Sequence, residues 1–216
     1  IGGNTFEVKL TVYRDCYNGL PNAEFDPEAS IGIFDANNNL VLSLMEAPGG
    51  QLLIPATVDD TLDIIISDPC LFAPDDICVH SMTYTDTIVL PPISGGYQLV
   101  YQRCCRHSTI SNIVSSFDTG ASFVINISET ALTECNSSPI FNAMPPVFLC
   151  INEPFEFDQS VIDIDGDSLV YSFCTPFDGA SFADPRPQPP LPPPYDPINW
   201  QNPPYSLSNL LGGVPL

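Results

Sequence analysis

Two adjacent cysteines at the end of a strand-like stretch constrain the fold more than any other feature of the sequence. Cys104 and Cys105 follow the alternating pattern of residues 96–103. Successive side chains of a strand point to opposite faces of a sheet, so each cysteine is expected to need its own partner. A bond between the two neighbours is not expected, because it would strain the peptide bond that joins them. The segment therefore predicts a central strand stapled on both faces, with the first domain built around it.

The number and spacing of the cysteines favour disulfides over a metal site or free thiols. No CxxC pair is followed by a matching CxxC or HxxxH, as a zinc site would require. An even number of cysteines without that spacing is typical of an oxidised, exported protein, so we expect an extracellular chain. The eight cysteines are Cys16, Cys70, Cys78, Cys104, Cys105, Cys135, Cys150 and Cys174.

Sequence separation suggests which cysteines pair. A short loop between two cysteines predicts the bond Cys70–Cys78, and a hairpin-like excursion predicts Cys150–Cys174. The remaining four allow two arrangements once a bond between neighbours is excluded. They are Cys16–Cys105 with Cys104–Cys135, which we prefer slightly, and Cys16–Cys104 with Cys105–Cys135.

The charge of the chain excludes one class of partner. Five basic residues stand against 26 acidic ones, for a net charge of −21. Such a chain repels phosphate backbones, which excludes nucleic-acid binding. Hydrophobic residues make up 44% and alternate strongly, which disfavours disorder. No apolar run is long enough to span a bilayer, so no membrane insertion is expected, and the missing initiator Met and signal peptide predict a piece of a longer, processed protein.

Strand patterns recur along the chain, whereas amphipathic helix patterns are nearly absent. About seven short strands at this spacing predict an antiparallel, immunoglobulin-like β-sandwich over residues 1–132. A hairpin is expected around the turn-rich residues 35–39. The predicted strands lie near residues 8–13, 31–33, 40–44, 62–66, 82–90, 96–105 and 121–128.

A second module is expected to begin at the polar, turn-rich residues 133–139. Further strand patterns occupy 147–150, 155–157 and 168–174, so residues 133–216 predict a second immunoglobulin-like or cadherin-like module that is incomplete. Within it, ten of the 21 residues 184–204 are proline, which favours extended polyproline-II chain. A stiff surface loop is the favoured interpretation of that segment, and a recognition role is the alternative.

Several segments together resemble a known group of proteins. They are Val12-Tyr13-Arg14-Asp15-Cys16, residues 96–106, Asn136-Ser137-Ser138-Pro139 and residues 163–171. The chain is similar to the large, repeat-bearing, gliding-motility-associated surface proteins of Bacteroidota. Those proteins are exported by the type nine secretion system and carry tandem immunoglobulin-like or cadherin-like modules. The resemblance implies a cell-surface adhesin or extracellular filament and no catalytic residues.

An acidic turn is the candidate metal site. Asp163, Asp165 and Asp167 alternate around Gly166, and Asp158 could add a ligand from the preceding segment. A hard cation takes six to eight oxygen ligands, and three carboxylates in a chain of this charge repel one another unless a cation bridges them. We therefore predict structural Ca²⁺. The alternative is a turn capped by its own side chains, without metal.

Catalysis is not expected. Cys104 or Cys105 with His107 could suggest a Cys-His nucleophile, but working pairs are brought together from separate segments. Carboxylate pairs in loops are ordinarily solvated, and glycosidase chemistry needs two of them across a cleft, usually with aromatic sugar platforms. The function predicted is a structural or adhesion module. We expect it to contact neighbouring modules, head to tail in one hypothesis, and an external surface or glycan is a further candidate partner. A carbohydrate-binding module of an exported polysaccharide-acting protein is the alternative.

Five positions match glycosylation patterns. Two asparagines occur in Asn-X-Ser triplets, and three hydroxyl residues follow aspartate and precede an apolar residue, a pattern of O-glycosylation in Bacteroidota. Such short matches arise often by chance. The positions are Asn126, Asn136, Thr61, Thr87 and Ser168.

Overall fold

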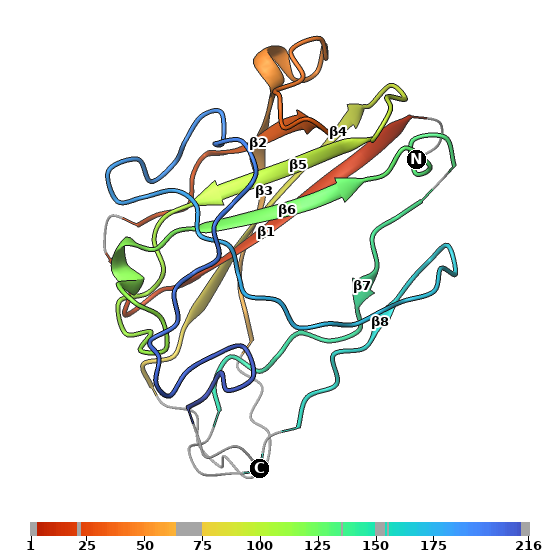
Figure 1. Ribbon diagram of the computed structural model, residues 1–216. Coiled ribbons are helices and arrows are strands. Elements are labelled where there is room, and N and C mark those ends of the chain that lie inside the picture. The colour runs from red at the N-terminus through yellow and green to blue at the C-terminus, as the bar shows by residue number, and fades with distance from the viewer. Residues whose placement is uncertain are drawn as a thin grey trace.

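The computed structural model describes residues 4–20, 23–63, 75–134, 136–149, 154 and 156–212. Within these residues the chain forms strands and two short 3-10 helices, drawn in Figure 1. None of the described helices is long and apolar enough to cross a membrane. The elements are β1 (Thr5–Asp15), β2 (Glu28–Asp35), η1 (Pro48–Gly50), β3 (Gln51–Thr61), β4 (Val79–Val89), β5 (Tyr97–Arg103), η2 (Ser116–Asp118), β6 (Ala121–Ile127), β7 (Ile140–Phe141) and β8 (Val161–Ile162).

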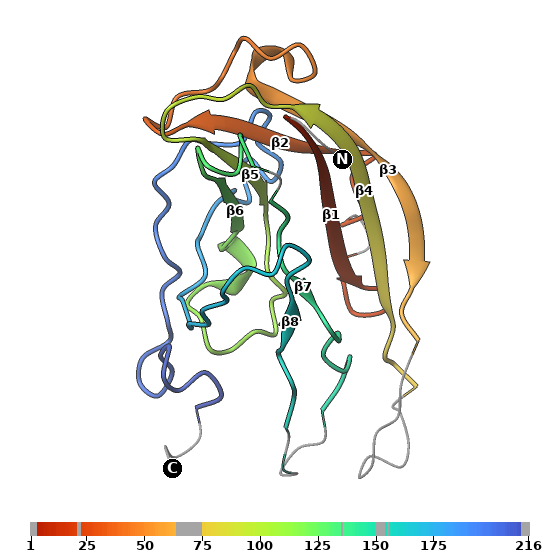
Figure 2. The same ribbon diagram turned by 90° about the vertical axis from the view of Figure 1, so that its right-hand side faces the viewer.

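The first six strands form one antiparallel sheet in the order β1-β4-β3-β2-β5-β6, which confirms the predicted all-β class. The sheet is curled rather than split into two separate sheets, as Figure 2 shows. Half of it, β1-β4-β3, faces the other half, β2-β5-β6. The predicted boundary between modules at residues 132–133, and their tandem arrangement, stay predictions.

Strand β3 makes the curl, because its two ends pair with different halves of the sheet. Its first part, Gln51–Pro55, pairs with β2, and its second part, from Ala56, pairs with β4. The register shifts between Ala56 and Val58, and such an irregularity bends a strand and increases its twist. Sequence patterns missed β3, because a proline inside a strand pattern argues against a strand.

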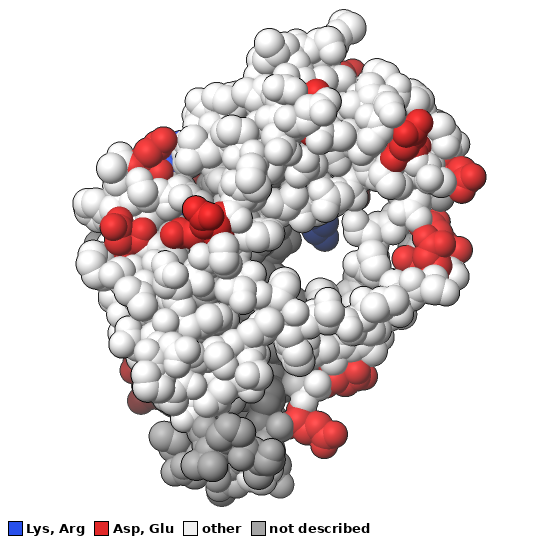
Figure 3. All heavy atoms as spheres, in the orientation of Figure 1, with Lys and Arg blue, Asp and Glu red and all other residues white. Residues whose placement is uncertain are grey.

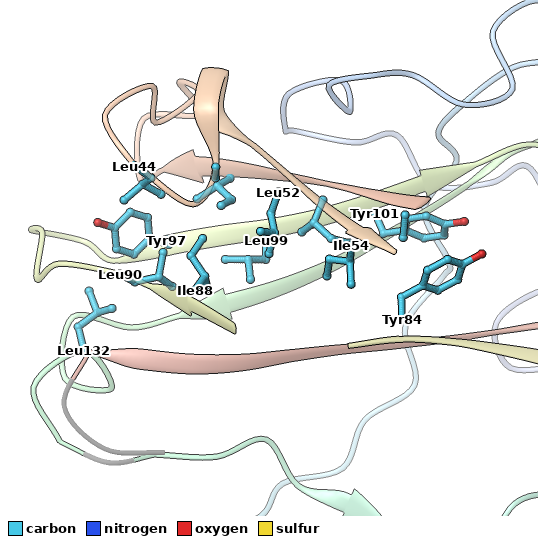
Figure 4. Close-up of a cluster of buried hydrophobic side chains, with 14 residues drawn as sticks. Leu44, Leu52, Ile54, Tyr84, Ile88, Leu90, Tyr97, Leu99, Tyr101 and Leu132 are labelled. Carbon is cyan, nitrogen blue, oxygen red and sulfur yellow. The ribbon is translucent and has the colours of Figure 1, made fainter. Parts of the chain in front are cut away.

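The core lies between the two halves of the curled sheet (Figure 4). Alternate residues of the facing strands supply it, with Leu132 closing one end after β6. Tyr84 is 2% exposed, and its hydroxyl donates a 2.7 Å hydrogen bond to the backbone carbonyl of Asp26. The buried phenol oxygen is thereby satisfied, so the aromatic ring is accommodated in the core without an unpaired polar group.

The outer face of β2 and β5 is covered by the proline-rich segment, residues 184–204. Val100 is fully buried although it points away from the core that Leu99 joins. A Cβ added to Gly32, which pairs with Val100, would lie 3.2 Å from Pro190. This segment is therefore packed against the sheet, in keeping with the predicted stiff surface loop rather than free chain.

The second half of the chain forms less strand than its pattern predicts. Among the described residues after 133, β7 and β8 are the only paired strands, and isolated bridges join Phe177 to Pro197 and Ser206 to Asn209. Residues 168–174 are rich in apolar side chains but make no backbone hydrogen bond with the described residues, so the expected strand does not form. Similarly, the turn at residues 35–39 forms, but the returning strand is reduced to one bridge, Phe34 to Leu40.

A disulfide closes one end of the sheet and corrects the predicted pairing. Cys16 follows β1 and Cys78 precedes β4, and the register of these strands places them opposite each other. They form a disulfide with a Cα–Cα distance of 5.2 Å. The predicted bonds Cys70–Cys78 and Cys16–Cys105 are therefore wrong. Strand register, which sequence separation does not reveal, decides the partner.

Removing this disulfide should destabilise the fold. Its main effect is to restrict the unfolded chain, so Cys16→Ser with Cys78→Ser should lower the free energy of unfolding by about 2–4 kcal/mol. Denaturant titration monitored by circular dichroism measures the loss. Cys174→Ser is the matched control, because Cys174 is exposed and unpaired. Equal stability of the double variant and the control would contradict the structural role of the bond.

Candidate functional site

The chain leaves the sheet at Arg103, and the adjacent cysteines lie just beyond. Cys104 and Cys105 form a disulfide with each other, their Cα atoms 3.0 Å apart. The predicted exclusion of this bond is wrong, and so is the preferred Cys104–Cys135 pairing. Because β5 ends at Arg103, the two side chains do not alternate across a strand, and the reasoning from opposite faces does not apply to them.

Asp26 joins the sheet to the proline-rich segment through two ion pairs. Arg103 Nε lies 3.0 Å from one carboxylate oxygen, and Arg186 Nη1 lies 2.9 Å from the other. The Asp26 side chain is only 11% exposed, so its charge is largely removed from water and depends on these partners. Arg103 Nη1 also donates to the backbone carbonyl of Pro185, 3.2 Å away, which holds the start of the segment.

Arg106 ties the loop after β5 to the start of β6 and to the chain that precedes the proline-rich segment. Its Nε donates to the Gly120 carbonyl and its Nη2 to the Phe177 carbonyl, at 3.1 and 3.2 Å. Burial lowers the pKa of Arg106, and the nearby Asp178 carboxylate opposes that shift. Asp178 in turn accepts the backbone N–H of Gly120 at 2.8 Å. Three of the five basic residues of the chain thus serve as structural ties.

A buried amide completes the attachment. Gln102 is 3% exposed; its Nε2 donates to the Ser122 hydroxyl at 2.8 Å, and its Oε1 accepts the Leu191 N–H at 2.7 Å. Ser122 itself donates to the carbonyl of Asp178 at 2.7 Å. Each polar atom in this chain of contacts has a partner, which buried polar groups require.

A polar depression lies beside the Asp26 ion pairs. Its volume is about 330 Å³, and it is lined by Asp26, Pro27, Glu28, Arg186 and Gln188. The lining offers charged and amide groups but no aromatic platform. The depression can therefore hydrogen-bond a small polar group, and two of its charged side chains, Asp26 and Arg186, are already paired with each other.

His107 stands near Asp15 rather than near a free thiol. Its Nδ1 contacts the Thr109 hydroxyl at 2.7 Å and its Nε2 contacts the Asn18 carbonyl at 3.1 Å. The backbone N–H groups of Asn18 and Tyr17 hold the pKa of Asp15 below its ordinary value, with a smaller effect from His107. Both cysteine sulfurs next to His107 in sequence are oxidised, so this arrangement offers no Cys-His nucleophile.

The described residues bring together one group of three metal-type ligands: Cys16, Cys78 and His80 lie within 4.8 Å of one another. The two sulfurs are bonded to each other and are not thiolates, the form that binds a metal. This group is therefore the disulfide with a neighbouring histidine, and it does not fit a metal.

The acidic turn adopts a capped form. Asp163 Oδ1 accepts the N–H groups of Asp165 and Asp167, each at 3.0 Å. Asp165 and Asp167 reach across to residues 136–137, where they accept from Ser137 N and Asn136 Nδ2, at 2.6 Å each. Asp158 caps its own turn through Ser160. The four predicted ligands do not converge among the described residues, and calcium binding stays a prediction.

Other predicted positions fall on the surface or outside the described chain. Cys174 is exposed without a disulfide partner, so the predicted Cys150–Cys174 bond does not form, since residues 168–174 lack the hairpin that would bring the sulfurs together. Cys70, Cys135 and Cys150 lie outside the described residues. The glycosylation candidates are all exposed: Asn126, Asn136, Thr61, Thr87 and Ser168.

Comparison with known protein families, with curated proteins and with solved structures finds no match to this chain.

Sequence patterns did not single out Arg103 and Arg106 as structural ties, and they missed the partners of both. Asp26 and Asp178 are two of 26 acidic residues, and nothing in their local sequence separates them from the solvated ones that Figure 3 shows on the surface. The sequence did hold one signal, the small number of basic residues, which is five. An arginine that becomes partly buried needs a carboxylate or carbonyl partner, so each of these few residues was a candidate for an ion pair.

Loss of the Asp26 charge should loosen the proline-rich segment. Asp26→Asn leaves the Arg103 guanidinium, 26% exposed, without its counterion and should cost about 1–3 kcal/mol of unfolding free energy. Arg186→Gln should cost less than about 1 kcal/mol, because Arg186 is 53% exposed. Denaturant titration measures both, with exposed Glu28→Gln as the control. Asp26→Asn matching Glu28→Gln would show that the pairs contribute nothing.

Proposed function

We propose that the chain is a non-catalytic structural or adhesion module of a large extracellular cell-surface protein or filament. One observation carries the proposal: the chemically reactive side chains that the described residues bring together serve to hold the fold. Cys16 and Cys78 close the sheet, while Asp26 ties Arg103 and Arg186 together.

Two further points support an extracellular site. Disulfides persist in oxidising compartments, and the described part of the chain contains two of them. The resemblance to gliding-motility-associated surface proteins implies the same location and an adhesive role. In such a protein the module would contact neighbouring modules, and its outer surface would meet a surface or glycan.

A carbohydrate-binding module is the second candidate, and the polar depression beside Asp26 favours it. Carboxylate, guanidinium and amide groups can hydrogen-bond sugar hydroxyls. A glycan array probed with the folded chain tests this function. Retention of one glycan class that Gln188→Ala reduces would support it, and an empty array would exclude the sugars tested.

Calcium would stiffen the acidic turn. Gly166 has φ +82°, a conformation that glycine adopts without strain, and it lets the chain turn sharply between the carboxylates. Asp165 and Asp167 are exposed and would rotate from their present partners to bind the ion. We propose this site as structural, with no part in a reaction.

Antibody labelling tests the surface location. Fab fragments raised against the folded chain should label intact cells of the source organism, and they should reduce attachment of those cells to surfaces. Lysed cells provide the control for total protein. Labelling that appears only after lysis would exclude the proposed location.

A melting experiment tests the calcium site. If Ca²⁺ binds the folded form alone, the melting temperature should be higher in millimolar Ca²⁺ than in excess chelator, and should rise with Ca²⁺ concentration. Asp165→Asn should remove most of that rise, whereas Asp59→Asn, an exposed change on β3, should preserve it. Equal melting temperatures in calcium and in chelator would refute the site.

A further inference from the structure

Strand β1 is an unpartnered edge of the sheet. It pairs along its whole length with β4, and no other described segment bonds its backbone. Near one end of β1 the Tyr13 hydroxyl contacts Met144 Sδ, just after β7, at 3.8 Å, and Figure 3 shows an opening through the molecule between the sheet and the β7–β8 segment. An open edge of 11 residues is long for a protein that does not use it.

The register shows which groups of β1 are free. Leu90 N bonds Asn4 O at one end and Cys16 N bonds Cys78 O at the other, and the pairing between them is unbroken. Antiparallel pairs alternate, so the even-numbered residues bond β4 and the odd-numbered ones point outward. The free N–H and C=O groups therefore belong to Thr5, Glu7, Lys9, Thr11, Tyr13 and Asp15.

The apolar inner face is also incomplete at the open side of the sheet. Phe123 and Ile125 of β6 pair with Tyr101 and Leu99, and cross-strand partners share one face, here the core face. Phe123 is nevertheless 59% exposed and Ile125 is 51% exposed. The inner residues of β1, such as Leu10, are likewise only partly buried. The curled sheet leaves room for one more apolar strand.

The same chain carries an extended apolar segment without a strand partner. Residues 168–173 make no backbone hydrogen bond with the described residues. Leu169, Tyr171 and Phe173 alternate, so in a strand they would share one face. Tyr171 is 59% exposed and Phe173 is 75% exposed. Residues 168–173 could therefore supply the apolar strand face that is missing at the open side of the sheet.

Charge favours this partner for β1. Lys9 and Arg14 are two of only five basic residues, and both lie on β1. The donor segment directly follows Asp163, Asp165 and Asp167. Glu7 and Asp15 balance these two charges, so β1 has no net charge and repels an acidic segment less than the rest of this chain does.

We propose that residues 168–173 of one copy add as a strand to the β1 edge of a second copy. This inference rests on the proposed structural role and names the contact between modules. The added backbone would bond the outward groups of β1, and Leu169, Tyr171 and Phe173 would cover the exposed inner face. Each copy both donates and accepts, so the contact repeats and builds an open chain of copies.

Two variants separate donor from acceptor. Lys9→Pro removes an outward N–H and adds bulk at the edge without breaking a bond to β4. This variant should still supply residues 168–173 to another copy, but its own β1 edge should not accept that strand. Phe173→Asp should accept the added strand at its β1 edge, but its own residues 168–173 should not add to another copy. Light scattering after size exclusion should find wild type in multiples of 23.5 kDa and each variant alone as a monomer. An equimolar mixture should form a one-to-one dimer.

Matched controls keep the result specific. Phe182→Asp changes a residue of similar exposure, 71%, outside the donor segment, and Lys9→Arg keeps both the N–H and the charge; both should assemble like wild type. Circular dichroism checks the sheet, and Ile125→Asp replaces Lys9→Pro if that variant unfolds. A monomeric wild type, self-assembly of either variant, or a mixture that stays monomeric overturns strand addition. None of these results affects the antibody test of surface location.

Discussion

The bend of β3 is the constraint on which the rest of the molecule depends. One strand pairs with both halves of the sheet, so the halves must face each other across a single core. Ala56, just after the bend, donates its N–H to the Pro27 carbonyl at 3.0 Å, which fixes Asp26 near the corner. From there the Asp26 carboxylate forms ion pairs with Arg103 and Arg186. The ion pairs and the proline-rich cover are thus consequences of how β3 turns.

The placement of its few basic side chains explains how so acidic a chain stays compact. Carboxylates that remain in water repel one another weakly, because solvent and salt screen them. The few guanidinium groups are concentrated where β5 ends, and there they bond backbone carbonyls as well as carboxylates. Arginine suits this task, because its planar group donates several hydrogen bonds in fixed directions.

The sequence predicts the strands that bury one face. It does not predict structure that depends on contacts between segments far apart in the sequence. The alternation in β1, β4, β5 and β6 reflects a core face and a solvent or cover face, so the pattern alone finds them. Residues 168–174 show the same pattern but lack a neighbour. Disulfide partners depend on register, as Cys16 and Cys78 show, and Asp26 acquires its role only from folding.

The bond between Cys16 and Cys78 has a consequence for a protein under tension. It closes a covalent loop that contains all of β2 and β3, with 62 residues of sequence separation. A pulling force on the two ends of the chain passes through the sulfur bridge and cannot draw that loop out. About 200 Å of potential extension is thereby removed, since an extended residue spans about 3.3 Å. If the chain serves as the structural module proposed above, the bridge limits how far that module can lengthen under load.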